Sequence, residues 1–326
     1  GDIFVGKIRK SVPGLNASFV NVGHEKDGFL HYHDLGPKLP SLIKYIKQVS
    51  TGKNKDYLLK QFRYKSDIEK DGNIADVLSP KQTVLVQIVK EPISTKGPRL
   101  SSEISLAGRF MVLMPFSDRV SISQKIEDRA EKTRLKKLVQ SIRPKGFGLI
   151  IRTVAEGQKV AALDADIEQL LKRWKNLSIK LKQIDKYPTK VLSEINRSSS
   201  IIRDIFDNNF TGIHVDDAEI QNEIKDYLEK IAPDKKSIVK LYDNHLPIFE
   251  KFGIERQIKS SFGKTVSMQK GAYLVIEHTE ALHVIDVNSG KRVNSKQDQE
   301  ANALEVNLIA AEEVAGDTRE LPDWTD

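Results

Sequence analysis

Asp286 and Asn288 stand at the end of an apolar, β-branched run, directly before a serine–glycine turn. Alternate residues of a strand point to the same face, so the carboxylate and the amide are expected to lie side by side. Magnesium takes one or two carboxylates from a protein and keeps waters and phosphate oxygens as its other ligands. The pair is therefore predicted to form half of a site that cleaves a phosphodiester. The alternative is a carboxylate that only caps the turn.

Arg152 and Thr153 end a second apolar strand, expected over residues 146–153. A guanidinium binds phosphate through paired, charge-assisted hydrogen bonds, and a neighbouring hydroxyl can add another. The pair is thus a candidate phosphate site. The alternative is an ordinary pair of surface residues.

Phe19 and Phe29 are expected on adjacent strands, with Lys7, Lys26 and Lys96 nearby. Aromatic rings beside positive charge are how OB folds hold single-stranded nucleic acid. The pattern therefore indicates a surface for a single strand. Either ring could equally belong to the hydrophobic core.

The first hundred residues are typical of a small β-barrel. Five short β-rich stretches, separated by proline and glycine turn formers, predict strands over 3–12, 16–22, 27–32, 83–90 and 99–106. Five such strands favour a barrel of the OB type. Residues 37–80 interrupt them as an insertion, in which apolar residues at helical spacing from Leu42 to Val49 predict a short helix.

Helices and strands alternate in the middle of the chain. The pattern predicts a strand over 110–114, a charged helix over 126–141 and a long helix over 162–184. Trp174 lies on the apolar stripe of the long helix, so it is predicted to belong to the core rather than to a stacking platform.

The last third predicts a strand over 212–215, helices over 218–231, 248–262 and 301–314, and strands over 272–276 and 282–287. Asp216 and Asp217 stand where a strand meets a helix. They are interpreted as N-caps rather than metal ligands. His214, between two β-branched residues, is likewise interpreted as structural.

Charge and composition narrow the class of protein. The 326 residues include 52 Lys and Arg against 45 Asp and Glu, a net charge of +7. Residues 298–326 carry −8, which leaves +15 on residues 1–297. A body this basic favours a polyanion such as nucleic acid, although lysines that only solvate the surface are the alternative.

The chain has no cysteine, which excludes a disulfide scaffold, a cysteine zinc site and a thiol nucleophile. No apolar run approaches the roughly 18 residues of a membrane-spanning helix, so no membrane span is expected. These features favour a cytoplasmic protein.

Several motifs together resemble one known family. The most specific are TEAL at 279–282, IDVNSG at 285–290 and NLIAAEEVA at 307–315. Further stretches are 1–8, 12–20, 28–30, 104–109 and 148–153. Taken in this order, residues 1 to about 315 resemble the ribonuclease E/G family, and within it the ribonuclease G-like members.

The resemblance implies an α+β multidomain fold. An OB-fold β-barrel that binds RNA would occupy residues 1–102, with the insertion at 37–80. A 5′-phosphate-sensing domain (103–198), an RNase H-like subdomain (199–261) and a partial DNase I-like catalytic subdomain (262–326) would follow.

The resemblance also implies a function. It is that of a single-strand-selective endoribonuclease in RNA processing and decay, which needs Mg²⁺ and favours 5′-monophosphorylated RNA. Its partners would be single-stranded RNA, namely mRNA and rRNA precursors, and, for a full-length protein, further copies of itself in a homo-oligomer. By motif, Asp286 would be a catalytic residue and a magnesium ligand, and Asn288 its hydrogen-bonding companion at the scissile phosphate.

Two further groups of residues match the family by motif. Arg152 and Thr153 would bind the terminal phosphate beside an apolar wall formed by Val112. A second group would hold the RNA strand and consists of Phe19, Phe29 and Lys96.

The sequence departs from the family pattern at its end. After Ala315 the family continues into a basic helix and a strand with a second metal-binding aspartate, whereas residues 316–326 read GDTRELPDWTD. The catalytic region is therefore expected to be truncated or altered there. A non-catalytic RNA-binding fragment or adaptor, in RNA processing or ribosome assembly, is the alternative. A DNA-binding protein fits the charge but no motif.

Overall fold

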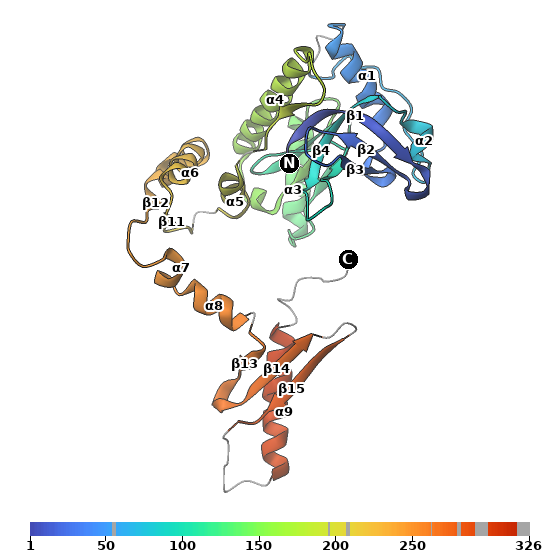
Figure 1. Cartoon of the computed structure of the whole chain (residues 1–326). Coiled ribbons are helices and arrows are strands. Elements are labelled where there is room, and N and C mark those ends of the chain that lie inside the picture. The colour runs from blue at the N-terminus through green and yellow to red at the C-terminus, as the bar shows by residue number, and fades with distance from the viewer. Residues whose placement is uncertain are drawn as a thin grey trace. The chain divides into compact units, whose positions relative to one another are not determined.

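The computed structural model describes residues 1–53, 57–194, 196–206, 209–261, 263–278, 282–290 and 299–317. The chain divides into two compact units (Figure 1). One unit contains residues 1–213 and 222–238, and the other contains residues 214–221 and 239–326. No helix in the described ranges is long and apolar enough to cross a membrane.

A closed five-stranded barrel forms the N-terminal part of the first unit, in agreement with the predicted OB-type barrel. Its strands are β1 (Ile3–Val12), β2 (Ala17–Asn21), β3 (Gly28–His31), β4 (Thr83–Lys90) and β5 (Arg99–Ser101). They pair in the order β1-β2-β3-β5-β4, and β4 pairs back onto β1 to close the barrel. A further strand, β10 (Thr189–Leu192), pairs with the start of β1. Gly28 allows β3 to approach the barrel interior, because a Cβ there would lie 2.5 Å from the Leu100 side chain.

The insertion between β3 and β4 contains α1 (Leu39–Ser50), as its spacing predicts, and a short helix, α2 (Ile74–Val77). Helix α1 is part of a core rather than an appendage. Tyr45 is fully buried, stacks on Trp174 with ring centroids 5.5 Å apart, and shares a 2.7 Å hydrogen bond with the Ser178 hydroxyl. The insertion therefore joins the barrel to the layer that follows it.

A second sheet follows the barrel, with the strand order β6-β7-β9-β8. Its strands are β6 (Leu106–Ala107), β7 (Met111–Pro115), β8 (Val120–Ile122) and β9 (Phe147–Ile151). The strand expected over 99–106 is thus two strands, because β5 ends in the barrel and β6 belongs to this sheet.

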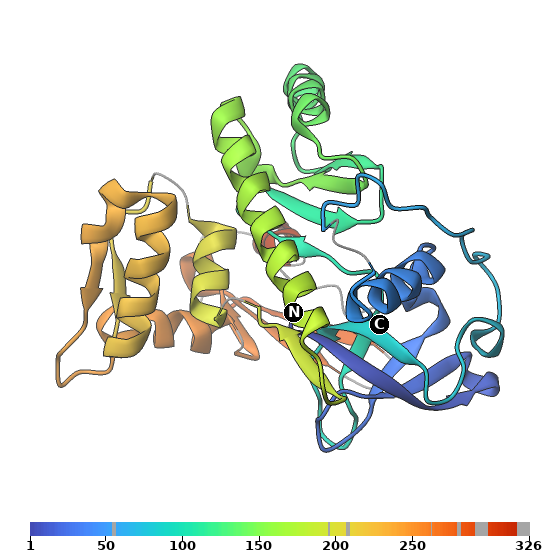
Figure 2. The same cartoon turned by 90° about the horizontal axis from the view of Figure 1, so that it is seen from above.

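Two helices accompany the second sheet, α3 (Arg129–Ile142) and the long α4 (Val160–Lys182), which runs along it (Figure 2). Both helices were expected from the sequence. Trp174 of α4 is fully buried, which confirms its assignment to the core. Alternate residues of β7 are buried, with Met111 and Leu113 in the core shared with α4 and Val112 half-exposed on the other face.

The next elements are α5 (Arg197–Ile205), β11 (Ile213–Val215), α6 (Ala218–Ile231) and β12 (Val239–Leu241), with β11 and β12 forming a two-stranded sheet. The Asp217 carboxylate accepts hydrogen bonds from the backbone N–H groups of Glu219 and Ile220 at 2.8 and 2.9 Å. Asp217 is therefore the N-cap of α6, as predicted. His214 lies against the Phe252 ring, with centroids 4.9 Å apart, but is exposed. The RNase H-like interpretation of this region stays a prediction.

The single amphipathic helix expected over 248–262 is wrong. The chain forms two short helices, α7 (Ile248–Lys251) and α8 (Ile254–Ser261). Gly253 separates them with a φ of +70°, a left-handed conformation that glycine adopts without steric cost and that ends a helix. Residue 262 lies outside the described residues.

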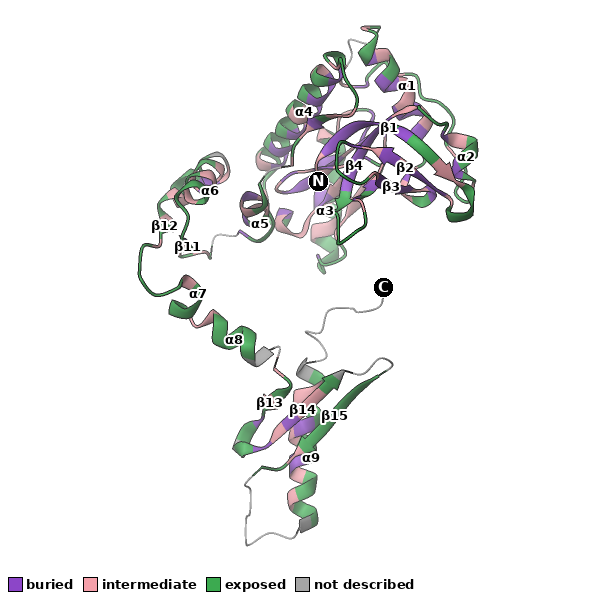
Figure 3. Ribbon diagram, viewed as in Figure 1, coloured by how far each residue is buried: buried purple, intermediate pink, exposed green. Residues whose placement is uncertain are grey.

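The second unit ends in a three-stranded antiparallel sheet and a helix. The strands β13 (Thr265–Ser267), β14 (Tyr273–His278) and β15 (His283–Asn288) pair in chain order, and α9 (Gln299–Asp317) follows. Leu274 and Ile276 of β14 pack with Val306 and Ala310 of α9 in a small core. Every residue of β15 except Asn288 is exposed (Figure 3). Both predicted strands and the predicted helix are thus present.

Candidate functional site

A row of aromatic rings lies on the barrel surface. Phe19 of β2 is the direct cross-strand partner of Phe29 of β3, and the two rings meet edge to face with centroids 5.8 Å apart. His31 is two residues further along β3 and therefore on the same face, with its ring stacked on Phe29 at 6.3 Å. Both phenylalanines are half-exposed, whereas Leu30 between Phe29 and His31 is fully buried. The rings therefore form an external platform and are not part of the barrel core.

Lys10 gives this platform a positive charge that the sequence reasoning missed. Lys10 pairs with Phe19 across β1 and β2, and its ammonium lies 5.1 Å from the centre of the Phe19 ring. Lys7 was expected nearby, but its ammonium lies over the ring of Tyr187 instead, also at 5.1 Å. The contact between Lys10 and Phe19 follows from the pairing register of β1 and β2. That register contains a one-residue irregularity in β1 between Ile8 and Lys10.

Lys96 is exposed on the loop that joins β4 to β5. The next residue, Gly97, packs closely on the start of β3, because a Cβ there would lie 2.1 Å from the Asp27 carbonyl oxygen. One residue further, the carbonyl of Pro98 accepts a 2.8 Å hydrogen bond from the N–H of Phe29. These contacts fix the loop beside the strand that carries Phe29, so Lys96 belongs to the same end of the barrel.

Arg152 and Val112 share one face of the second sheet. Val112 is the cross-strand partner of Ile150, and Arg152 follows Ile150 by two residues. This face is half-exposed, whereas Leu149 and Ile151, which alternate with these residues along the strand, are fully buried on the other face. The sheet thus carries the Arg152 and Val112 side chains on the same face, and their role in phosphate binding stays a prediction.

The Arg152 side chain is held at its position by backbone groups. The side-chain Nη1 donates to the carbonyl of Gly108 at 3.0 Å. The backbone N–H of Arg152 donates to the carbonyl of Phe110 at 2.9 Å. The Thr153 hydroxyl shares a 2.9 Å hydrogen bond with the Ser123 hydroxyl, at the end of β8. Thr153 is therefore anchored to the sheet, and its hydroxyl is already in contact with another polar group.

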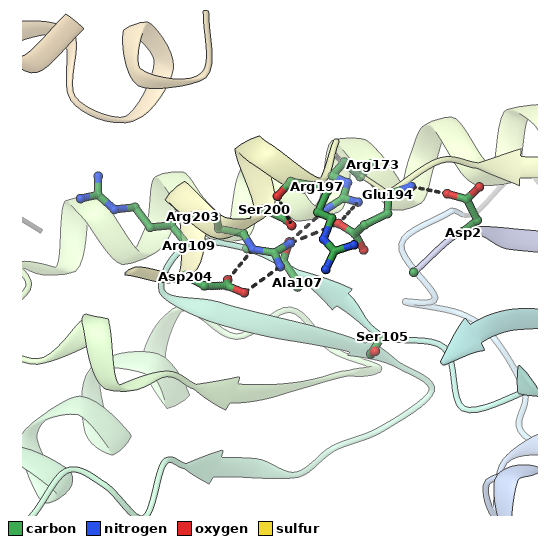
Figure 4. A network of polar contacts seen from close by, with 12 residues as sticks. Asp2, Ser105, Ala107, Arg109, Arg173, Glu194, Arg197, Ser200, Arg203 and Asp204 are labelled. Carbon is green, nitrogen blue, oxygen red and sulfur yellow. Dashed lines mark hydrogen bonds and ion pairs between the residues drawn. The ribbon is translucent and has the colours of Figure 1, made fainter. Parts of the chain in front are cut away.

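A network of charged residues that includes Glu194, Arg203 and Asp204 was not anticipated by sequence reasoning (Figure 4). The Asp204 carboxylate, at the end of α5, forms a 2.7 Å ion pair with Nη2 of Arg152 and a 2.8 Å ion pair with Nε of Arg203. Glu194 binds Arg203 at 3.1 Å from the other side. The candidate phosphate-binding arginine is therefore paired with an acidic side chain of the protein itself.

The network shifts the pKa values of its members. Burial raises the pKa of Asp204, but hydrogen bonds from Arg203 and Arg152 outweigh burial and leave that pKa below its usual value. Burial raises the pKa of the nearby Tyr227 hydroxyl to about 12, even though Arg203 and Arg109 favour its ionised form. At neutral pH the cluster thus contains ionised arginines, an ionised Asp204 and a neutral Tyr227.

Asp286 and Asn288 lie side by side on β15, as the alternation predicts. The Asn288 amide Nδ2 donates a 2.9 Å hydrogen bond to one carboxylate oxygen of Asp286. Their cross-strand partners on β14 are Val275 and Tyr273, whereas Leu274 and Ile276 point to α9. The pair therefore occupies the face of the sheet opposite α9.

Gly290, two residues after the end of β15, adopts a conformation that only glycine fits. Its φ is +67°, and a Cβ would lie 2.1 Å from the carbonyl oxygen of Gly271. The close approach fixes the turn after Asn288 against the segment that leads into β14.

The Asp286 and Asn288 pair fits half of a magnesium site. Asp286 is exposed, so a magnesium ion held by one of its carboxylate oxygens could take waters and phosphate oxygens as its other ligands. Within the described ranges, no cluster of three or more histidine, aspartate or glutamate residues could hold a metal ion.

Residues 105–320 match the model of the ribonuclease E/G family, a stretch that covers more than half of the chain and includes Arg152 and Asp286. The chain belongs to the ribonuclease E/G family. Membership in the ribonuclease E/G family confirms the resemblance drawn from the motifs.

Individual relatives in the ribonuclease E/G family agree. Ribonuclease G of Haemophilus influenzae is 33% identical over 317 residues, which cover 97% of this chain and 60% of that protein. Ribonuclease E of Nostoc sp. is 35% identical over 327 residues, 98% of this chain and 43% of that protein. Ribonuclease G of Escherichia coli is 29% identical over 320 residues, 98% of this chain and 61% of that protein. The chain thus spans about 60% of the length of these ribonuclease G relatives.

Two stretches that bear on the family comparison lie outside the described residues. They are residues 279–281 of the TEAL motif and residues 318–326, which belong to the tail that departs from the family pattern. The proposed boundaries of the four domains and the roles of the site residues stay predictions.

Proposed function

We propose that this chain acts in RNA processing and decay as a magnesium-dependent, single-strand-selective endoribonuclease that favours 5′-monophosphorylated RNA. The observation that carries the proposal is the family match over residues 105–320, which contains both the candidate phosphate site and the Asp286–Asn288 pair. The relatives' printed names, ribonuclease G and ribonuclease E, support the same reaction class.

The barrel platform would hold the single strand. Bases stack on the exposed faces of Phe19 and Phe29, while Lys10 and Lys96 attract the phosphate backbone. Stacking does not depend on base identity, because every base has an aromatic face. The net charge of +15 on residues 1–297 adds a long-range attraction, so binding weakens as the salt concentration rises.

The open face of the second sheet would receive the 5′ end. Arg152 supplies a guanidinium whose orientation is fixed by the carbonyl of Gly108, and the half-exposed side chain of Val112 limits the space beside it. A guanidinium fork binds two oxygens of a terminal phosphate at once. A 5′-hydroxyl offers no such pair of oxygens, which is the physical basis of the proposed preference.

Asp286 and Asn288 would form the part of the catalytic site that this chain supplies. Asp286 would hold magnesium through the carboxylate oxygen that faces away from Asn288, while the Asn288 hydrogen bond keeps the carboxylate in one rotamer. When bound, the ion would supply a polarised water and neutralise charge on the scissile phosphate.

A second candidate is an RNA-binding module that does not cleave. It is favoured by one observation: within the described ranges, Asp286 has no neighbouring group of carboxylates or histidines large enough to hold a metal ion. The two candidates share the barrel platform and differ only in whether a phosphodiester is broken.

Cleavage of labelled RNA separates the two. The chain is incubated with a 5′-monophosphorylated, fluorescent single-stranded RNA, either with magnesium or with a chelator, beside the variants D286N and D243N. Asp243 is exposed between β12 and α7 and serves as the control. Magnesium-dependent cuts that D286N loses and D243N keeps are expected. Salt-sensitive binding without any cut would overturn the nuclease proposal and favour the binding module, and absence of RNA binding would overturn both.

A further inference from the structure

The Asp204 carboxylate lies between two guanidinium groups. Its Oδ1 is 2.7 Å from Nη2 of Arg152 and 2.8 Å from Nε of Arg203, and its Oδ2 is 3.4 Å from Nη2 of Arg203. The Asp204 side chain is 42% exposed, whereas those of Arg152 and Arg203 are 23% and 10% exposed. Two largely buried guanidinium groups therefore bind one carboxylate that is open to solvent.

Each arginine is anchored through atoms that do not face this anion. Arg152 donates from Nη1 to the carbonyl of Gly108, and Arg203 donates from Nη1 to Glu194 at 3.1 Å. Arg152 binds Asp204 through Nη2, and Arg203 binds Asp204 through Nε and Nη2. The position between the two guanidinium groups would therefore keep its cationic geometry if the carboxylate moved away.

A terminal phosphate matches this position better than the carboxylate does. A carboxylate carries one negative charge on two oxygens, whereas a phosphate monoester at neutral pH carries about 1.5 to 2 negative charges on three terminal oxygens. Guanidinium groups bind both kinds of anion through the same paired hydrogen bonds. The two anions are thus chemically interchangeable at this site, and the more highly charged one is favoured.

We propose that Asp204 is an internal competitor for the 5′-terminal phosphate of RNA, and that Arg203 is the second cation of that phosphate site. The incoming monophosphate displaces the Asp204 carboxylate from Arg152 and binds between the guanidinium groups of Arg152 and Arg203. This inference rests on the proposed preference for 5′-monophosphorylated RNA and adds its specificity-determining residues. A 5′-hydroxyl end, which lacks the charge, leaves Asp204 in place.

The competition has a consequence that a purely structural ion pair does not have. Removal of the Asp204 charge opens the site, so D204N should bind 5′-monophosphorylated RNA more tightly and leave binding of 5′-hydroxyl RNA unchanged. The preference is measured as the dissociation constant for 5′-hydroxyl RNA divided by that for 5′-monophosphorylated RNA. This ratio is expected to rise roughly threefold to fivefold, the size expected when one partly exposed ion pair no longer competes. If Asp204 served only to hold α5, D204N would lower stability without raising this ratio.

Asp67 provides a matched control. It forms an ion pair with Lys38 at the same 2.7 Å and is 45% exposed, but it lies in the insertion. D67N removes an equal charge, and any general electrostatic gain from it would strengthen binding of both RNAs alike. The ratio should therefore stay at the wild-type value in D67N.

The experiment measures binding of two short single-stranded RNAs that differ only in a 5′-phosphate or a 5′-hydroxyl, in a chelator so that no cleavage occurs. The proteins are wild type, D204N, D67N, R203K and R152Q, with folding checked by circular dichroism. A raised ratio in D204N, a lowered ratio in R203K and an unchanged ratio in D67N are expected. An unchanged or lowered ratio in D204N overturns the inference.

Failure of the inference and failure of the proposed function give different results. If wild type prefers the phosphorylated RNA and R152Q loses the preference while D204N does not alter it, the phosphate site stands and only the competitor role fails. If neither wild type nor D204N distinguishes the two RNAs, both the competitor role of Asp204 and the proposed 5′-phosphate preference fail. Should D204N not fold, hydrogen exchange of wild-type α5 replaces it. Faster exchange at the end of α5 with the phosphorylated RNA alone supports displacement of Asp204, and equal exchange with both RNAs contradicts it.

Discussion

Asp166 and Arg152 bind the same short backbone segment from different sides. The Asp166 carboxylate accepts hydrogen bonds from the N–H groups of Arg109, Phe110 and Met111 at 3.1, 2.9 and 3.0 Å. Arg152 donates to the carbonyl of Gly108, at the start of that segment. The entry into β7 is thus fixed by one buried carboxylate and one guanidinium, and the candidate phosphate site depends on both.

Replacing Asp166 by alanine is expected to destabilise the first unit strongly. The change leaves three N–H groups without their acceptor, and each buried, unsatisfied donor costs about 1–3 kcal/mol. A loss of at least about 3 kcal/mol in the free energy of unfolding is expected in urea titrations. Asp164, exposed on the same helix, is the control, and D164A should stay within about 0.5 kcal/mol of wild type. Equal stabilities of D166A and D164A would contradict this role.

Alanine at Phe19 or Phe29 is expected to weaken single-stranded RNA binding. Each lost stacking partner removes about 1–3 kcal/mol of binding free energy, so the dissociation constant should rise roughly 5-fold to 150-fold. Fluorescence anisotropy with a short RNA measures the change. Tyr64, an exposed ring that packs on Phe62 and Phe116 away from the barrel strands, is the control. Equal losses in Y64A and F29A would argue against the platform.

The Glu131 carboxylate should give a stability contribution that disappears in acid. Hydrogen bonds from Arg134 and from the Gly157 N–H lower its pKa from 4.5 to about 2. A carboxyl with a lowered folded-state pKa stabilises the fold above its unfolded pKa and loses that contribution as pH falls through the folded value. The difference in unfolding free energy between wild type and E131Q should therefore be constant from neutral pH to about 4.5 and shrink towards pH 2.

The control for this prediction is Glu168, an exposed carboxylate on α4. The stability of E168Q should follow that of wild type across the same pH range. A difference between wild type and E131Q that persists undiminished at pH 2 would show that packing, not charge, is what the substitution removes.

Gly290 and Gly253 allow the cost of a close contact to be separated from the cost of backbone strain. Their φ angles are nearly the same, +67° and +70°, but a Cβ meets the Gly271 carbonyl at 2.1 Å in the first and nothing within 4 Å in the second. G253A should lose about 1–2 kcal/mol from the left-handed conformation alone. G290A should lose more, because its backbone must also shift, as thermal unfolding of the second unit would show. Equal losses would mean that the Gly271 contact is loose.

The sequence by itself determined the elements whose pattern is local. Alternating apolar residues and turn formers predicted the barrel strands, and Asp286 and Asn288 share a face because a strand repeats every two residues. The family motifs also lie in continuous stretches. The prediction of a single helix over 248–262 was wrong because Gly253 adopts a left-handed conformation. That one residue interrupts the helix although the amphipathic pattern continues on both sides of it.

Only the tertiary structure decided which side chains meet across the chain. The pairing of Lys10 with Phe19 depends on an irregular strand register, and the insertion is joined to the core by a hydrogen bond from Tyr45 to a residue 133 positions away. Asp204 meets Arg152 only because α5 returns to the end of β9. Ion pairs and ring contacts depend on distances of a few ångströms between segments far apart in sequence, and no local periodicity encodes such distances.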